Sequence, residues 1–151
     1  MRVGELCNRE VVVADRSMSV PEGARLMRQH HVGDLVIVEE HGERCFPVGI
    51  VTDRDLVVEV LANNLAPETL SLGDIMTFDL ITAREDDDPL DIIKRMRDKG
   101  IRRMPVVTES GCLVGILTMD DVLDLIAEQL ADLVILVGRE QRREVDRQPP
   151  E

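Results

Sequence analysis

Aromatic residues are almost absent from this 151-residue chain, which has no Tyr, no Trp and only two Phe. A core built from this sequence must therefore be aliphatic, and a planar ligand must be held between Val, Ile, Leu or Met side chains. Proteins that bind single-stranded nucleic acids stack the bases on aromatic rings, so this class of partner is disfavoured. The apolar content of 44% still supports a globular domain.

Cysteine and long apolar runs are also scarce. Cys7, Cys45 and Cys112 are odd in number and form no C-x-x-C pair. This pattern argues against a disulfide framework or a zinc site and favours a reducing compartment. The longest apolar run, residues 133–137, is too short to cross a membrane, and the N-terminus lacks an apolar signal core. We therefore expect a soluble, cytoplasmic protein.

Positive charge is the minority, and the formal net charge is -12. Such a field steers DNA, RNA and anionic membranes away, so an anionic ligand would need a local basic pocket. The acidic run 85–88 has no helper ligands at the spacing of a metal cage, and we expect Asp88 to cap a helix instead. His30, His31 and His41 show no metal spacing either. No metal site is predicted.

The chain contains a tandem repeat. Residues 49–55, GIVTDRD, recur as residues 115–121, GILTMDD. Upstream, residues 3–6 match residues 72–75 at a constant offset of 69, whereas the two motifs are offset by 66. The first copy must therefore carry three extra residues, which fit in the segment 39–45. A hairpin connection is where such an insertion costs least.

Both copies predict the order β-α-β-β-α, which indicates an α+β fold. Each first helix has a predicted cap, Ser19 or Asp88, followed by Pro21 or Pro89 in its first turn. The predicted strands and second helices complete the unit. The strands are expected at 11–13, 35–38 and 48–51, and at 80–82, 104–107 and 113–117; the second helices run from about 53 to 61 and from about 119 onward.

These patterns divide the chain into a first repeat at 1–66, a second repeat at 67–137 with a long C-terminal helix, and a charged tail at 138–151 that we expect to be frayed. Residues 62–71 form the link between copies. The long helix carries an apolar stripe beyond the repeat, and a second subunit is its plainest cover, so we expect a homodimer. The stripe comprises Ile126, Leu130, Leu133, Val134 and Val137.

The tandem order, the two G-h-h-T-x-x-D phrases and the segment 101–107, IRRMPVV, together resemble the cystathionine-β-synthase (CBS) domain family. Two copies resemble a CBS pair, or Bateman module, here expected to be a stand-alone protein. The resemblance covers residues 1 to about 127. It implies pseudo-two-fold packing of the repeats through their sheets, with clefts that bind adenosine-containing ligands, and it implies no chemistry of the module itself.

The T-x-x-D phrase allows two interpretations. A Thr cap followed by an acid at the third helical position is nearly a capping box, which satisfies exposed backbone N–H groups. The resemblance adds that Asp55 and Asp121 would accept hydrogen bonds from ribose hydroxyls. Thr52 and Thr118, with the free N–H groups beside them, could hold a phosphate. The two roles can coexist.

If the clefts are built crosswise, as in family members, the first would combine Thr52 and Asp55 with Ile81, Arg102 and Arg103. Arg54 would add charge there. Met76, which is assigned to neither cleft, could line a pocket for a base. Guanidinium groups bind phosphate in bidentate fashion, so the first cleft would take a nucleotide.

The second cleft would combine Thr118 and Asp121 with Val12, Gly33 and Asp34. Gly33 and Asp34 stand where the second copy has arginines, and an Asp would repel a phosphate. The second cleft is therefore expected to be empty or to prefer a nucleoside-like or cationic ligand.

The sequence therefore predicts a regulatory module that binds AMP, ADP or ATP as a regulatory ligand, needs no cofactor and signals to an unidentified protein. One alternative is a structural dimerisation module without a ligand. Another is a binder of S-adenosylmethionine or NAD. No nucleophile with a placed base is found, so an enzyme is not predicted.

Overall fold

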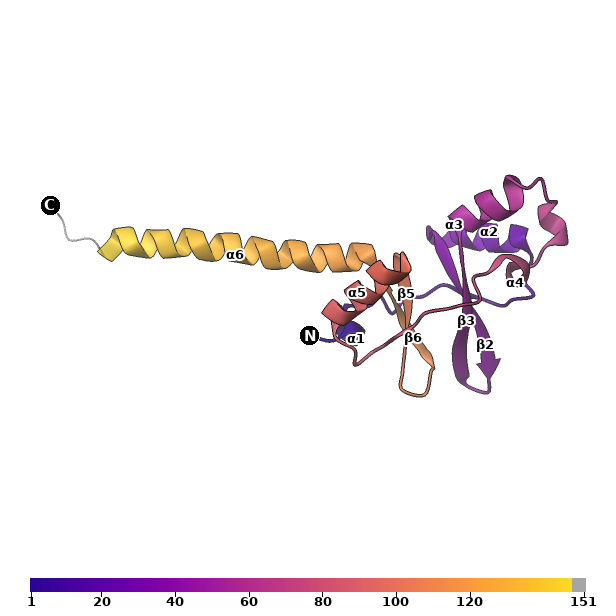
Figure 1. Cartoon of the computed structure of the whole chain (residues 1–151), viewed down its shortest axis with the longest axis horizontal. Helices are drawn as coiled ribbons and strands as arrows, with labels where there is room; N and C mark the ends of the chain where they lie inside the picture. Colours follow the sequence, from indigo (N-terminus) through magenta and orange to yellow (C-terminus); the bar gives the residue numbers. More distant parts are fainter. Residues whose placement is uncertain (148–151) are drawn as a thin grey trace. The chain divides into compact units, whose positions relative to one another are not determined.

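The computed structural model describes residues 1–147, and the chain divides into two compact units, 1–117 and 118–151, each described by itself. The first repeat contains α1 (Val3–Leu6), β1 (Val13–Ala14), α2 (Val20–His30), β2 (Asp34–His41), β3 (Arg44–Thr52), α3 (Asp53–Asp55) and the π-helix η1 (Leu56–Leu61). After the 3-10 turn η2 (Pro67–Thr69) come α4 (Leu72–Ile75), β4 (Ala83–Arg84), α5 (Pro89–Lys99), β5 (Arg103–Val107), β6 (Leu113–Thr118) and α6 (Met119–Arg147) (Figure 1).

Two small sheets organise the described residues. One has the order β1-β2-β3 and the other β4-β5-β6. In the first sheet β1 runs parallel to β2, and β2 pairs antiparallel with β3. In the second, β4 runs parallel to β5. This arrangement confirms the predicted α+β class and the repeated β-α-β-β-α order.

The caps of the two long helices of the first unit follow the prediction. Ser19 accepts a hydrogen bond from the Glu22 amide, and Asp88 accepts one from the Leu90 amide. A proline stands in the first turn of α2 and of α5, where its missing N–H leaves no intrahelical bond unmade. Each helix therefore starts where the sequence predicts.

The strands depart from the prediction in two places. The first strand of each repeat lies about two residues later than expected, at Val13–Ala14 and Ala83–Arg84. In the first repeat the hairpin is longer than predicted, because β2 and β3 continue through most of the expected connection and turn only at Gly42, which has a φ of 67°. A shift of register between Ile37 and Val38 leaves Val48 as one extra residue on β3.

The two repeats exchange their N-terminal segments, which the sequence did not reveal. The amides of Val3 and Gly4 in α1 donate to carbonyls of Asp87 and Glu85 in the second repeat, at 3.1 and 2.9 Å. In the same way, α4 of the second repeat donates to carbonyls just before α2 in the first. Figure 1 shows α1 near α5 and α4 near α2. Each short helix therefore completes the other repeat.

Aliphatic side chains fill both the repeats and the space between them. The core of the first repeat contains two side chains that come from the second, Leu72 and Met76. A separate cluster joins Val36 and Val38 of β2 to Ile116 of β6. These contacts join the two repeats, in keeping with residues 1–117 forming one compact unit.

The C-terminal helix extends further than predicted. Helix α6 continues through Gly138 to Arg147, so the expectation of a frayed tail is wrong for residues 138–147, and residues 148–151 lie outside the described part. Gly138 costs the helix about 1 kcal/mol. The residues after it are good helix formers, and opposite charges such as Glu140 and Arg143 are spaced to support the helix. Within residues 1–147 no helix combines the length and apolar character that a membrane crossing requires.

Candidate functional site

The first T-x-x-D phrase forms the tight turn between β3 and α3. The Asp55 amide donates to Thr52 Oγ1 at 3.2 Å, and the Thr52 amide donates to Asp55 Oδ2 at 2.8 Å. This is a capping box, so the structural interpretation of the phrase is confirmed. Within residues 1–147 the other carboxylate oxygen of Asp55 has no hydrogen-bond partner. That oxygen is available to a ligand.

The second phrase repeats this geometry at the start of α6. The Thr118 amide donates to Asp121 Oδ2 at 2.8 Å, the Thr118 hydroxyl donates to the same oxygen at 2.7 Å, and the Asp121 amide donates back to Thr118 Oγ1. These two residues belong to the second unit, whereas Val12, Gly33 and Asp34 belong to the first. The cleft predicted between them therefore stays a prediction.

A pocket of about 450 Å³ lies beside Asp55. Asp55, Glu59 and Asn63 of the first repeat contribute to its wall, and residues 74–77 of the second repeat contribute another part. The pocket thus brings together Asp55 and Met76, two of the predicted site residues. Its size falls within the range of about 300–1,000 Å³ that is usual for small-molecule sites. The lining residues are Asp55, Glu59, Asn63, Leu65, Leu70, Asp74, Ile75, Met76 and Thr77.

Two backbone features hold the second repeat's part of the wall in place. The Thr77 amide donates to the Ile50 carbonyl of β3 at 3.0 Å. Met76 is buried, and a Cβ built on Gly49 would lie 2.6 Å from its Sδ. Only a glycine in β3 lets the Met76 side chain come so close.

The ionisable groups that line the Asp55 pocket are all acidic. Asp55, Glu59 and Asp74 are carboxylates, and no Lys, Arg or His is among the lining residues. A negative field of this kind opposes a phosphate and favours a neutral or cationic ligand. Glu59, Asn63, Asp74 and Thr77 were not predicted as site residues. For Glu59 the signal was its spacing of one helical turn from Asp55; the sequence offers none for Asp74.

Arg103 makes an ion pair that the sequence analysis did not anticipate. Its Nε lies 2.7 Å from Asp34 Oδ2, and the two side chains are 35% and 17% exposed. Burial raises the pKa of the Asp34 carboxyl above its ordinary range; the Arg103 guanidinium opposes this rise and the charge of Asp53 adds to it. The prediction had placed Arg103 in one cleft and Asp34 in the other. In the structure these two residues, at pseudo-symmetric positions of the two repeats, face each other.

The ion pair nonetheless lies close to the Thr52 turn. The Asp53 amide donates to the Gly33 carbonyl at 3.0 Å. A Cβ built on Gly33 would lie 3.2 Å from Asp53 Oδ2 and 3.4 Å from Arg103 Nη2. Arg103 thus stands beside the first turn, as predicted, but its charge is already matched by Asp34.

The remaining predicted residues do not line the Asp55 pocket. Arg54 and Arg102 are exposed. Ile81 is half-buried just before β4. Val12 packs against the core of the first repeat, and its carbonyl accepts the Val36 amide at 3.1 Å.

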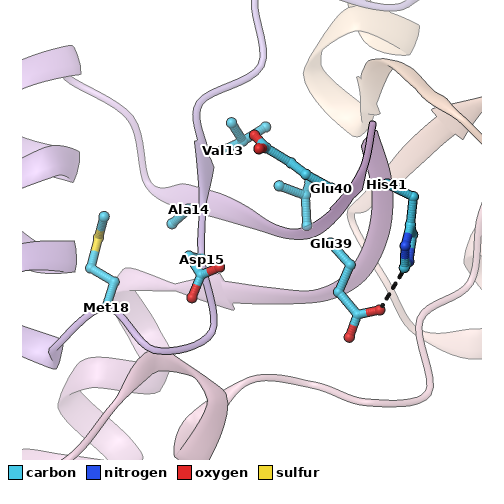
Figure 2. A pocket seen from close by; sticks show the side chains of 8 residues that line it. Val13, Ala14, Asp15, Met18, Glu39, Glu40 and His41 are labelled. Atoms are coloured by element: carbon cyan, nitrogen blue, oxygen red, sulfur yellow. Dashed lines mark ion pairs between the residues drawn. The ribbon is translucent and has the colours of Figure 1, made fainter. Parts of the chain in front are cut away.

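A second pocket, of about 540 Å³, lies within the first repeat. Figure 2 shows Asp15, Glu39, Glu40 and His41 around it. His41 Nε2 lies 3.7 Å from Glu39 Oε2, a contact that is an ion pair when the imidazole is protonated. Part of its wall comes from the lengthened hairpin, which the sequence analysis treated as a plain connection. Over residues 1–147 no group of three His, Cys, Asp or Glu side chains is placed to hold a metal ion.

The chain matches the family model of the CBS domain twice, over residues 3–62 and 72–128. An uncharacterized protein of Methanopyrus kandleri is 42% identical over 123 residues, which cover 82% of this chain and 61% of that protein. The L-aspartate semialdehyde sulfurtransferase of Methanocaldococcus jannaschii is 32% identical over 120 residues, covering 80% of this chain but only 22% of the enzyme. The chain therefore spans less than two thirds of both relatives.

Solved structures give the same result for the fold. A CBS domain pair crystallised with 5′-methylthioadenosine and S-adenosyl-L-methionine superimposes with a TM-score of 0.74 at 30% identity, over 85% of this chain and 98% of that one. A conserved protein of Pyrococcus horikoshii superimposes with a TM-score of 0.73 at 28% identity, over 82% and 90% of the two chains.

Proposed function

Because this chain belongs to the CBS domain family and carries the domain in tandem, we propose that it is a regulatory module that binds an adenosine-containing small molecule and reports the bound state to a partner protein. One observation carries the proposal. The pocket at Asp55 is built by both repeats, and it offers a carboxylate oxygen without a partner in the described residues. Such an oxygen can accept hydrogen bonds from ribose hydroxyls.

The charge of the pocket favours an adenosine compound without phosphates. The sequence prediction of AMP, ADP or ATP rested on Arg102 and Arg103, and neither residue lines this pocket. Three carboxylates do line it, and they would attract a sulfonium cation and tolerate a neutral thioether. The 30% identical CBS pair that was crystallised with 5′-methylthioadenosine and S-adenosyl-L-methionine supports this choice.

Regulation follows from the position of the pocket between the repeats. A ligand shifts a conformational equilibrium only by as much as its affinity differs between the two states. Asp55 comes from the first repeat and Met76 and Thr77 from the second, so a ligand that contacts both favours one arrangement of the pair. The proposal assigns binding to this module and no reaction.

A second candidate is a structural module without a ligand. It is favoured by one observation: the T-x-x-D phrase and Arg103 both have complete structural roles, as a capping box and as the partner of Asp34. It does not account for the second oxygen of Asp55 or for the polar wall around it.

The test is a ligand panel measured by dye-based thermal shift and then by calorimetric titration. The panel contains S-adenosylmethionine, 5′-methylthioadenosine, AMP, ADP, ATP and NAD. We expect the first two to bind most tightly and Asp55→Ala to weaken them. Asp98→Ala is the matched control, since it removes an exposed carboxylate on α5 away from the pocket. If no member of the panel binds, the structural candidate is correct.

A further inference from the structure

Helix α6 presents a continuous apolar face that the described part of the chain leaves exposed. The apolar residues recur at alternating steps of three and four, the spacing of a coiled-coil seam. Their side chains are between 52% and 60% exposed. We define the apolar seam as Leu123, Ile126, Leu130, Leu133 and Val137.

Charges along the same helix are segregated by sign. The first half of α6 contains five acidic residues and no basic one, and the part after Gly138 contains four arginines among three acidic residues. The acidic residues of the first half are Asp120, Asp121, Asp124, Glu128 and Asp132; the arginines are Arg139, Arg142, Arg143 and Arg147. One helix therefore carries a negative half and a more positive half.

From the seam and this charge pattern we infer that two copies of the chain associate through α6 as an antiparallel helix pair. In one register of such a pair Leu130 lies opposite Leu133, and Ile126 lies opposite Val137. The same register brings Asp124 level with Arg139 of the second copy. It also brings Asp120 level with Arg143, so the acidic half of each copy runs alongside the arginine-containing part of the other. Asp124 and Arg139 lie outside the seam, so the attraction is between the charged halves of the two helices and not between side chains paired within the interface.

The alternatives place like charges together. In a parallel pair each acidic residue of the first half would lie level with its own copy. In a shorter antiparallel overlap, Leu123 would face Leu133, but Asp124 would then lie level with Asp132 and Glu128 with itself. Like charges across a helical interface oppose pairing, and aligned helix dipoles add to the cost of the parallel arrangement.

The second copy is a better occupant than a membrane surface. The helix carries eight acidic residues against four arginines, and its acidic half is repelled by anionic lipid. The seam is also long enough for a pair. The helix has 29 residues, a length of about 44 Å at 1.5 Å per residue.

Charge reversal in solution tests both the pairing and its direction. Asp120→Arg with Asp124→Arg should weaken dimerisation about threefold, since each substitution occurs twice in the dimer and exposed charges beside an interface interact weakly. Arg139→Glu with Arg143→Glu should weaken it equally. All four substitutions in one chain should restore it, because an antiparallel pair is complementary again. Arg147→Glu is the matched control. The position opposite Arg147 in the second copy comes before the start of α6, so no charge of that helix lies there.

Sedimentation velocity at several concentrations gives the dissociation constants. The unmutated chain should have twice the 17.0 kDa chain mass, and Leu130→Glu with Leu133→Glu should be a monomer with unchanged circular dichroism of the folded core. A monomer of the unmutated chain at all concentrations, or a mass of four chains, would overturn the inference. Tighter pairing after Asp124→Arg would support the shorter overlap and overturn the register, and failure of the fourfold variant to restore pairing would overturn the direction. None of these outcomes depends on ligand binding.

Discussion

Single residues at this site combine structural and binding roles. Asp55 lines a pocket and uses one carboxylate oxygen to receive the Thr52 amide, and its other oxygen has no hydrogen-bond partner within residues 1–147. Arg103 could have bound a phosphate, but it pairs with Asp34 at 2.7 Å. The function of each residue therefore depends on a partner that only the fold supplies.

Removing the Asp55 carboxylate should separate these two roles. A hydrogen bond to a charged group contributes about 1.5–3 kcal/mol, so Asp55→Ala should weaken the adenosine ligand about thirtyfold. Loss of the hydrogen bond from the Thr52 amide to the Asp55 carboxylate should also cost about 1 kcal/mol of stability. Asp55→Asn keeps an oxygen that can accept the Thr52 amide. Compared with Asp55→Ala, it should restore more of the lost stability than of the lost affinity. Calorimetry and urea denaturation measure the two effects.

Asp121→Ala is the comparison for this variant. It removes the equivalent carboxylate of the second repeat, which accepts the Thr118 amide and hydroxyl at the start of α6. We expect a similar loss of helix-cap stability and a much smaller loss of affinity for the ligand of the Asp55 pocket. Equal losses of affinity in the two variants would contradict the assignment of the main site to Asp55.

Asp34 should give the stability of the chain a specific dependence on pH. Burial raises the pKa of this carboxyl in the folded chain, above an unfolded value near 3.8. The folded chain holds the Asp34 proton more tightly than the unfolded chain does. The stability gained in this way is fully present below the unfolded pKa and is lost as the pH rises through the folded pKa. The unfolding free energy of the unmutated chain minus that of Asp34→Asn should therefore decrease as the pH rises above 3.8.

Urea denaturation from about pH 3.5 to about pH 7 measures this difference, because the window must include both pKa values. Asp98→Asn on α5 is the control, since its carboxylate is exposed and pairs with Arg97 at the surface. Two parallel stability curves for the unmutated chain and Asp34→Asn would show that Asp34 does not titrate differently on folding.

At the scale of the element, the glycine that opens each repeated phrase serves packing. A Cβ on Gly49 would lie 2.6 Å from Met76 Sδ, and a Cβ on Gly115 would lie 2.6 Å from Cys7 Sγ. In each case the side chain belongs to the segment that the other repeat supplies. The glycines thus let the exchanged segments lie directly on β3 and β6.

Gly49→Ala should therefore destabilise the fold. Overpacking of this kind typically costs about 1–3 kcal/mol, and the nearby Thr77 carbonyl limits how far Met76 can move. Gly138→Ala is the matched control, because nothing lies within 4 Å of a Cβ at this position in α6. That change should stabilise the helix by up to about 1 kcal/mol. Chemical denaturation of both variants decides the matter; equal effects of the same sign would refute the packing role.

Elements with local signals could be predicted, and those set by distant contacts could not. Ser19 and Asp88 gave the helix starts, because capping depends on neighbouring residues. The longer hairpin of the first repeat escaped prediction, since its outer residues are polar and its register shift near Val38 leaves no sequence pattern. The helix beyond Gly138 was missed because a charged segment was taken as unable to order itself.

In the candidate site, too, features with a local sequence signal could be predicted and those set by distant contacts could not. The repeat and the resemblance identified Asp55. Met76 was predicted only to line a pocket for a base, and the structure places it in the wall beside Asp55. The pairing of Arg103 with Asp34 could not be found, because each residue alone fits a ligand site or a surface equally well. Asp74 contributes to the pocket only through the exchange of segments.

At the scale of the whole first unit, that exchange is what joins the repeats. The hydrogen bonds of α1 and α4 are made by backbone amides, which carry no side-chain signature, so a constant offset of 69 revealed the repeat but not the exchange. Leu72 of the second repeat is fully buried in the core of the first, together with Val20, Met27 and Leu35. Neither repeat has a complete core by itself.

Leu72→Ala should consequently destabilise residues 1–117 as a whole. Truncating a fully buried Leu typically costs about 2–5 kcal/mol. Because Leu72 belongs in sequence to the second repeat and in space to the first, we expect one cooperative unfolding transition. Amides of β2 in the first repeat and of β5 in the second should lose protection from hydrogen exchange to the same extent.

Leu90→Ala is the control, since this side chain on α5 is 67% exposed and its loss should change little. Loss of protection confined to β5, or two separate transitions, would mean that the repeats fold independently despite the exchange.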